Sequence, residues 1–211
     1  AVTNGRGVYE NIKNVIGFLL SGNMAGIFCV LYASLMALPA PFAAVHLLFI
    51  NLLTDSLPAI AIGMEPASSD LLNRKPRDPK EPLLSGDLVK RIGLQGLLIA
   101  VPVMTAFYLG YQTGTAEAMT MAFATLTLAR LFHGFNCRED RSILRMGLSG
   151  NPASLAAFGV GVLLLLAVLL IPALHGLFLV ADLTLAQLGM ILGLAVLPTL
   201  CIQITRIARG K

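Results

Sequence analysis

The sequence has few charged residues for its length. Charged side chains make up 12% of the 211 residues, whereas a soluble domain carries roughly 25%. Hydrophobic residues make up 56%, and the mean hydropathy is +0.81. This composition excludes an ordinary water-soluble domain.

Cysteine is also scarce. Cys29, Cys137 and Cys201 are odd in number and have neither metal-ligand nor paired spacing, which argues against a disulfide framework and favours packing roles. No metal spacing relates the histidines either, and we expect these to be core or interface residues: His46, His133 and His175.

Targeting and repeat signals are absent too. The first hydrophobic stretch is too long for a secretory signal, contains Asn23, and has no small-residue cleavage site behind a basic start. The chain contains no internal repeat, low-complexity tract or alternating strand pattern. We therefore predict one all-α bundle.

Long apolar runs are what the sequence has instead. A bilayer core about 30 Å thick needs about 20 apolar residues in a helix. Six stretches meet this length, and we predict membrane helices at Ile12–Leu38, Phe42–Glu65, Ile92–Tyr111, Ala116–Phe135, Ser154–Leu174 and Leu183–Thr205. The fold class is thus an integral membrane bundle in contact with lipid. The predicted units are a hinge at 1–11, helix pairs at 12–65, 92–135 and 154–205, loops at 66–91 and 136–153, and a tail at 206–211.

The basic residues predict the orientation of this bundle. Of the fifteen Lys and Arg residues, all except Arg130 precede the first helix, open it, or fall in alternate connections and the tail. Short connections rich in Lys and Arg stay cytoplasmic, so both termini are expected in the cytoplasm. The net charge of +4 follows from this bias and from attraction to anionic lipid. We expect no binding of nucleic acid.

The longest predicted cytoplasmic connection runs from Pro66 to Lys90. It contains the run Arg74-Lys75-Pro76-Arg77-Asp78-Pro79-Lys80-Glu81-Pro82, whose prolines favour an extended, semi-rigid chain. Two interpretations are open: a solvated linker, or a docking surface for another cytoplasmic domain that transmits its state to the membrane.

The second predicted helix carries polar residues near its middle. An ionised Asp55 costs at least ~2.5 kcal/mol there, so it marks a site for ions or protons. Asn51, Thr54 and Asp55 stand at i, i+3 and i+4, which predicts one shared helix face. Pro58 has no N–H, so we expect the Thr54 carbonyl to be freed and the helix to kink or unwind.

Oxygens of these kinds suit a hard cation. Calcium takes six to eight oxygen ligands, and helices broken within the membrane are a recurrent way of presenting them. Asn23 and Asp55 both lie about 15 Å from the cytoplasmic ends of their helices, so Asn23 could complete the same site. The alternatives are a structural hydrogen-bonded cluster with Asp55 protonated, and Asn23 as an interhelical hydrogen-bond partner.

Several motifs resemble P-type calcium pumps. The run from Asn51 to Pro58, continuing to Gly63-Met64-Glu65-Pro66, is similar to their sixth membrane helix. The segments Gly5 to Lys13, Arg77 to Leu83 and Met119 to Ala122 resemble the hinge into the fifth helix, the loop between the sixth and seventh, and the eighth helix. The last two predicted helices fit by hydropathy only. The likeness is to the fifth to tenth helices of a single-site, bacterial-like pump.

The resemblance implies an ATP-driven exporter of cytosolic calcium in a bacterial-type plasma membrane. It implies metal ligands at Asn51 and Asp55, next to the family's fourth helix, and at Asn23 and Thr54 in the second site of two-site pumps. The sequence lacks an Asp-Lys-Thr-Gly phosphorylation motif, a nucleotide-binding domain and the fourth-helix glutamate. We therefore expect a fragment whose partners are the missing membrane helices and cytoplasmic domains, which would use ATP and magnesium.

Two residues depart from the two-site pattern. Gly26 and Arg130 stand where two-site pumps have glutamates, which implies one calcium per cycle. Because side chains on a helix tilt toward its N-terminus, Arg130 should lean deeper toward Asp55 and Asn23. There it would act as a built-in cation in place of the second ion. The alternative is an arginine that snorkels to the membrane surface.

Three other functions remain open on the sequence. A carrier or channel could use the same residues without ATP, and six helices with both ends inside suit it equally well. Oxygen ligands also suit a pump for manganese or another divalent cation. A purely structural membrane subunit is the third, although it leaves Asp55 unexplained.

Overall fold

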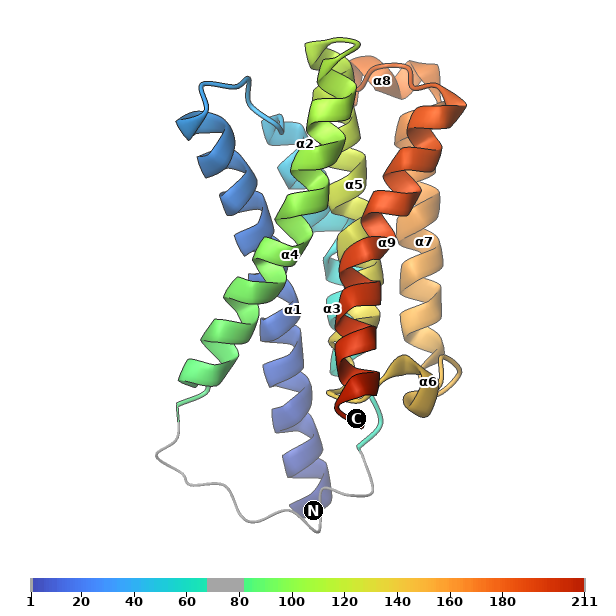
Figure 1. Ribbon diagram of the computed structural model, residues 1–211. Coiled ribbons are helices and arrows are strands. Elements are labelled where there is room, and N and C mark those ends of the chain that lie inside the picture. The colour runs from blue at the N-terminus through green and yellow to red at the C-terminus, as the bar shows by residue number, and fades with distance from the viewer. Residues whose placement is uncertain (1, 68–81, 211) are drawn as a thin grey trace.

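The computed structural model describes residues 2–67 and 82–210, and within these ranges it contains helices and no strand. The prediction of an all-α membrane bundle is confirmed (Figure 1). The elements are α1 (Val2–Leu35), α2 (Ala44–Phe49), the π-helix η1 (Ile50–Thr54), α3 (Ser56–Gly63), α4 (Gly86–Tyr111), α5 (Thr115–Asn136), α6 (Ile143–Met146), α7 (Pro152–Leu170), α8 (Pro172–Phe178) and α9 (Leu185–Ala208).

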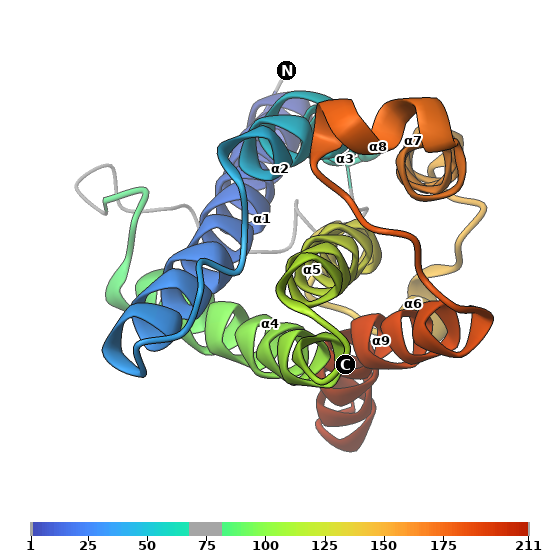
Figure 2. The same ribbon diagram turned by 90° about the horizontal axis from the view of Figure 1, so that it is seen from above.

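Within the described residues, five helical segments are long and apolar enough to cross a membrane: Gly5–Leu35, Ala44–Gly63, Gly86–Tyr111, Pro152–Leu170 and Leu185–Ala208. Helix α5 is not among them, because its threonines, Arg130 and His133 lower its hydropathy. It lies in the middle of the other helices (Figure 2), and most of its side chains are buried. A helix enclosed by protein needs no lipid-facing apolar surface. The count of six spans stays a prediction.

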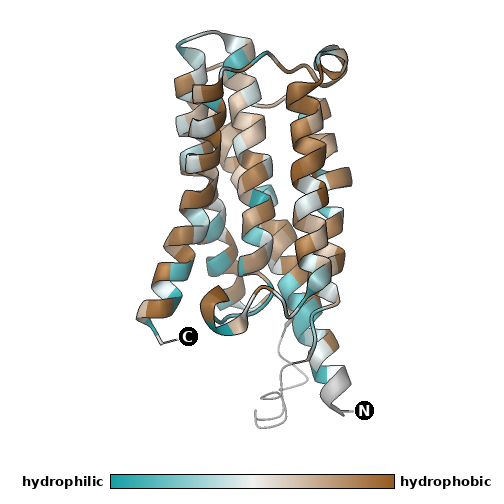
Figure 3. Ribbon diagram, turned by 90° about the vertical axis from the view of Figure 1, so that its right-hand side faces the viewer, coloured by the Kyte–Doolittle hydropathy of each residue, from teal (hydrophilic) through white to brown (hydrophobic). Residues whose placement is uncertain are grey.

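The beginning of α1 and the end of α9 lie at the same end of the bundle (Figure 1). Hydrophobic residues dominate the length of the long helices, and hydrophilic residues become frequent toward that end (Figure 3). Which side of the membrane this end faces is not fixed by the fold, so the cytoplasmic placement of both termini stays a prediction.

Several helix ends differ from those expected. Helix α1 begins at Val2, so residues 2–11, expected as a separate hinge, continue the first membrane helix. Helix α4 begins at Gly86 rather than Ile92, because the Ser85 side chain caps it by accepting a hydrogen bond from the Leu88 N–H. The run expected as Ser154–Leu174 is two helices, α7 and α8. They are separated at Ile171, which is extended because it precedes Pro172.

Close backbone approaches hold α4 against its neighbours. A Cβ atom on Gly96 would lie 3.1 Å from the Ser21 carbonyl oxygen of α1, and one on Gly110 would lie 2.7 Å from the Ala118 Cα of α5. Only glycine fits at such contacts. The α1, α4 and α5 backbones therefore form a tightly packed group that positions the polar residues of α1 and α5.

The expected packing residues are mostly buried. Cys29 and Cys137 are buried, whereas Cys201 is exposed on α9, and all three are free thiols. His46 stacks on Phe123 with ring centroids 4.4 Å apart. Residues 68–81 lie outside the described ranges, so the docking interpretation of the loop that contains Arg74, Lys75 and Arg77 stays a prediction.

Candidate cation site

The membrane helix that contains Asp55 is interrupted by a turn of π-helix. In η1 the Asp55 N–H donates to the Ile50 carbonyl at 2.8 Å, the i to i+5 pattern of a π-helix. The Ser56 hydroxyl donates to the Leu52 carbonyl at 2.9 Å. The π-turn at Ile50–Thr54 therefore lies before the kink that was expected between Thr54 and Pro58. Pro58 lies in the first turn of α3, where a backbone N–H would have no acceptor within the helix, so proline is tolerated there.

The π-turn changes which side chains share a face. Thr54 and Asp55 are buried, at 1% and 2% exposure, whereas Asn51 is exposed. A π-turn holds more residues than an α-turn, so the expected alignment of positions i, i+3 and i+4 is lost. The Thr54 hydroxyl donates to the Ile50 carbonyl at 3.1 Å. The structure thus places Thr54 beside Asp55 in the bundle and leaves Asn51 on its exposed side.

A guanidinium from the central helix reaches the buried carboxylate. Arg130 Nη2 of α5 donates to Asp55 Oδ2 and, at 3.2 Å, to Asn23 Oδ1 of α1. The Arg130 and Asp55 side chains are each 3% exposed. Asp55 also stands at the N-terminus of α3, where the helix dipole favours a negative charge. The structure therefore brings together Asp55, Asn23 and Arg130 from three separate helices.

Each member of this ion pair has a further buried polar atom that could bind a ligand. Among the described residues, Asp55 Oδ1 and Arg130 Nε are buried without a hydrogen-bond partner. Buried polar groups ordinarily have a hydrogen-bond partner, so two unpartnered atoms in the same ion pair indicate a site for a further ligand. No group of three His, Cys, Asp or Glu side chains within the described ranges is close enough to hold a metal ion. A cation here would take most of its ligands from amide, hydroxyl and carbonyl oxygens.

Gly22 provides the space for the guanidinium, a role that sequence reasoning missed. A Cβ atom on Gly22 would collide with the Arg130 guanidinium, including Nη2 at 2.6 Å. Gly26, one turn along α1, has nothing within 4 Å of its would-be Cβ atom. A larger residue at the first position would displace the guanidinium, whereas the second position is open to a larger side chain.

A further polar cluster lies one turn along α5 from Arg130. His133 Nε2 lies 2.9 Å from the Ser21 hydroxyl of α1, and Asn136 Nδ2 donates to the Thr199 hydroxyl of α9 at 2.9 Å. All four side chains are buried. The expected core role of His133 agrees with these contacts, which tie α1, α5 and α9 together next to the candidate site.

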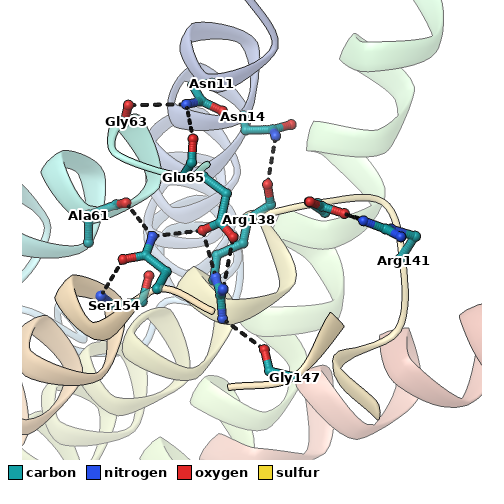
Figure 4. Close-up of polar contacts among 11 residues, drawn as sticks. Asn11, Asn14, Ala61, Gly63, Glu65, Arg138, Arg141, Gly147 and Ser154 are labelled. Carbon is teal, nitrogen blue, oxygen red and sulfur yellow. Dashed lines mark hydrogen bonds and ion pairs between the residues drawn. The ribbon is translucent and has the colours of Figure 1, made fainter. Parts of the chain in front are cut away.

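A second buried ion pair holds the other end of α3. Arg138 Nε and Nη2 donate to the two carboxylate oxygens of Glu65, each at 2.8 Å, in a bidentate geometry (Figure 4). Asn151 Nδ2 donates to Glu65 Oε2 at 2.7 Å and to the Ala61 carbonyl at 2.8 Å. Asn11 Nδ2 of α1 donates to the Glu65 carbonyl at 2.8 Å. We call Glu65, Arg138, Asn151 and Asn11 the clamp.

The clamp could not be assigned from the sequence. In the sequence, Glu65 ends a predicted helix and belongs to the run that resembles the sixth membrane helix, and Arg138 is one of the basic residues that predict the orientation. The two are 73 positions apart, so no local spacing connects them. The sequence indicates this pair only weakly, because it predicts no more than that a carboxylate and an arginine lie on the same side of the membrane.

The chain matches a known family over most of its length. Residues 39–208 match the model of the family described as "Cation transporting ATPase, C-terminus". The chain belongs to this family. The match includes both helices whose resemblance rested on hydropathy only. Together with the relatives described next, it confirms the likeness to the C-terminal transport region of P-type calcium ATPases.

The relatives of this cation transporting ATPase region are bacterial and eukaryotic. The "Calcium-transporting ATPase" of Bacillus subtilis is 36% identical over 214 residues, covering 100% of the chain and 24% of the relative. The "Calcium-transporting ATPase 1" of Lactococcus lactis is 36% identical over 212 residues, with the same two shares. The "Calcium-transporting ATPase type 2C member 1" of Mus musculus is 29% identical over 197 residues, covering 92% and 22%. The chain thus spans about a quarter of the length of the bacterial relatives.

The space at Gly22 generates a test by substitution. Gly22→Ala should lower the apparent unfolding temperature, because the methyl group displaces the Arg130 guanidinium from Asp55. Gly26→Ala is the matched control, and it should leave the temperature unchanged or raise it, since alanine favours a helix over glycine by about 1 kcal/mol. Thermal unfolding of the purified protein in detergent measures both. Equal behaviour of the two variants would contradict the role of Gly22.

The clamp generates a second test. Arg138→Gln leaves the buried Glu65 carboxylate without its cation, a change that costs about 3–5 kcal/mol. We expect a lower unfolding temperature for the variant protein. The double variant Glu65→Gln with Arg138→Gln should lose less than the two single changes added together.

Arg141→Gln is the control for the clamp, because Arg141 pairs with Glu139 at 2.6 Å on the exposed surface. An exposed pair contributes about 0–1 kcal/mol. If the Arg138 and Arg141 variants unfold at the same temperature, the clamp does not stabilise the bundle.

Proposed function

We propose that this chain is the cation-binding part of an ATP-driven calcium pump, which exports one calcium ion per cycle from the cytosol of a bacterial-type cell. The observation that carries the proposal is the buried Asp55 at a helix break, paired with Arg130 and left with an unpartnered carboxylate oxygen. The names of the relatives support calcium as the transported ion. ATP and magnesium would act in parts of the whole pump outside this chain.

Asp55 is proposed as the indispensable ligand because it supplies the negative charge. Thr54 would add a neutral oxygen from inside the bundle, and Asn23 and Asn51 would add oxygens from exposed positions. Calcium takes six to eight oxygens, so these four side chains need to be supplemented. Main-chain carbonyls at η1 and a further membrane segment of the whole pump, on the side to which Asn51 is exposed, would supply the rest.

Arg130 is proposed to limit the site to one ion. Its guanidinium is always protonated, and its contacts with Asp55 and Asn23 place that charge among the proposed ligands. A fixed positive charge repels a second divalent ion strongly where the dielectric constant is low. Gly26 offers no side-chain oxygen in compensation. Binding of calcium would then require the guanidinium to share or release the Asp55 carboxylate.

Removal of the Asp55 charge is the first test. In the full-length pump, Asp55→Asn should abolish calcium-dependent phosphorylation from ATP, because a neutral amide cannot compensate a divalent charge in the membrane. Asp182→Asn is the control, since that carboxylate is 92% exposed and lies in the connection between α8 and α9. Normal calcium transport by the Asp55 variant would place the site elsewhere. Replacing calcium by manganese in the same assay decides which ion the pump moves.

Arg130 generates the second test, in reconstituted vesicles of the full-length pump. The wild type should transport one calcium ion per ATP hydrolysed, and a ratio of two would refute the role of Arg130. In Arg130→Ala, protons and calcium compete for Asp55 without the fixed charge. The apparent calcium affinity should therefore fall more steeply than in the wild type as the pH is lowered. Arg141→Gln serves as a charge-matched control.

A further inference from the structure

A pocket of about 450 Å³ opens between α4 and α9, at the end of the bundle where hydrophilic residues gather. Four cationic side chains line it: Lys90, Arg91, Arg206 and Arg209. Two carboxylates, Asp87 and Asp140, line it as well. The balance of charge is therefore positive, and none of these residues belongs to the proposed calcium site.

Two of the cations are held in place, and two extend freely. Arg206 Nη2 donates to the Asn136 carbonyl at 2.8 Å. Asp140 Oδ1 lies 3.7 Å from Arg91 Nη1 and 3.9 Å from Arg206 Nη2, so it orients both guanidinium groups without a close contact to either. Lys90 and Arg209 are exposed and have no ion-pair partner among the described residues. They are available to an anion.

The pocket continues into apolar surface away from the charges. Leu94 follows Lys90 by one turn of α4 and is 69% exposed, and Ile202 precedes Arg206 by one turn of α9. Both line the pocket. Because α4 and α9 run in opposite directions (Figure 1), the two apolar residues lie on the membrane side of the cations. The pocket is thus cationic at the bundle end and apolar toward the membrane interior.

We propose that this pocket binds an anionic phospholipid. The headgroup phosphate would contact Lys90 and Arg209, with Arg91 behind them, and the acyl chains would lie along Leu94 and Ile202. Basic pockets between membrane helices bind anionic headgroups in this way. A soluble phosphate would use the cations but not the apolar walls, which is why a lipid fits better. A bound lipid would bridge α4 and α9, and the proposal does not depend on which ion the pump moves.

The test uses the full-length pump, delipidated in detergent and incubated with phosphatidylglycerol or phosphatidylcholine. Bound lipid is counted by native mass spectrometry. Phosphatidylglycerol should be retained by the wild type and phosphatidylcholine should not. The variant Lys90→Gln with Arg209→Gln should bind phosphatidylglycerol at least about tenfold more weakly, because each cation near an anionic headgroup contributes ~1 kcal/mol.

The control variant Lys13→Gln with Arg141→Gln removes two positive charges outside the pocket and should bind phosphatidylglycerol like the wild type. Size-exclusion chromatography of each variant checks that it is folded. Equal retention of the two lipids, or unchanged binding by the pocket variant, would overturn the proposal. Displacement of phosphatidylglycerol by an equimolar amount of inorganic phosphate would also overturn it, because the site would then recognise phosphate alone.

Discussion

A carboxylate buried among membrane helices needs a positive charge close to it, and the Asp55 to Arg130 pair meets this need. Neither group is stable alone in an apolar surrounding, because the cost of removing each charge from water is several kcal/mol. Their contact fixes α5 against the junction of η1 and α3, and Asn23 of α1 joins the same guanidinium. One charged contact thus joins three helices.

Other features of the bundle follow from this contact. Gly22 is free of a side chain where the guanidinium passes, and the π-turn of η1 sets Asp55 into the bundle while Asn51 stays exposed. Helix α5, which carries Arg130, occupies the centre, where its polar side chains find partners on neighbouring helices. Its low hydropathy and its central place have the same cause: it faces protein rather than lipid.

The short helix α3 is held by ion pairs at both of its ends. Asp55 precedes its first residue and pairs with Arg130 in α5, and Glu65 follows its last turn and pairs with Arg138 just after α5. Both arginines come from the same stretch of chain, so α3 and the central helix are fastened together at two levels. The eight residues of α3 separate the two pairs.

The sequence by itself determined the all-α membrane class, most of the membrane helices and the presence of a carboxylate, Asp55, within one of them, because composition and hydrophobic length act locally. It also predicted, from helix direction and calculated depth in the membrane, that Arg130 leans toward Asp55 and Asn23. Only the tertiary structure decided where the second membrane helix changes to a π-helix and that Gly22 faces the Arg130 guanidinium, because both depend on packing between helices. The clamp from Glu65 to Arg138 likewise joins residues 73 positions apart, and only the folded chain brings their charges together.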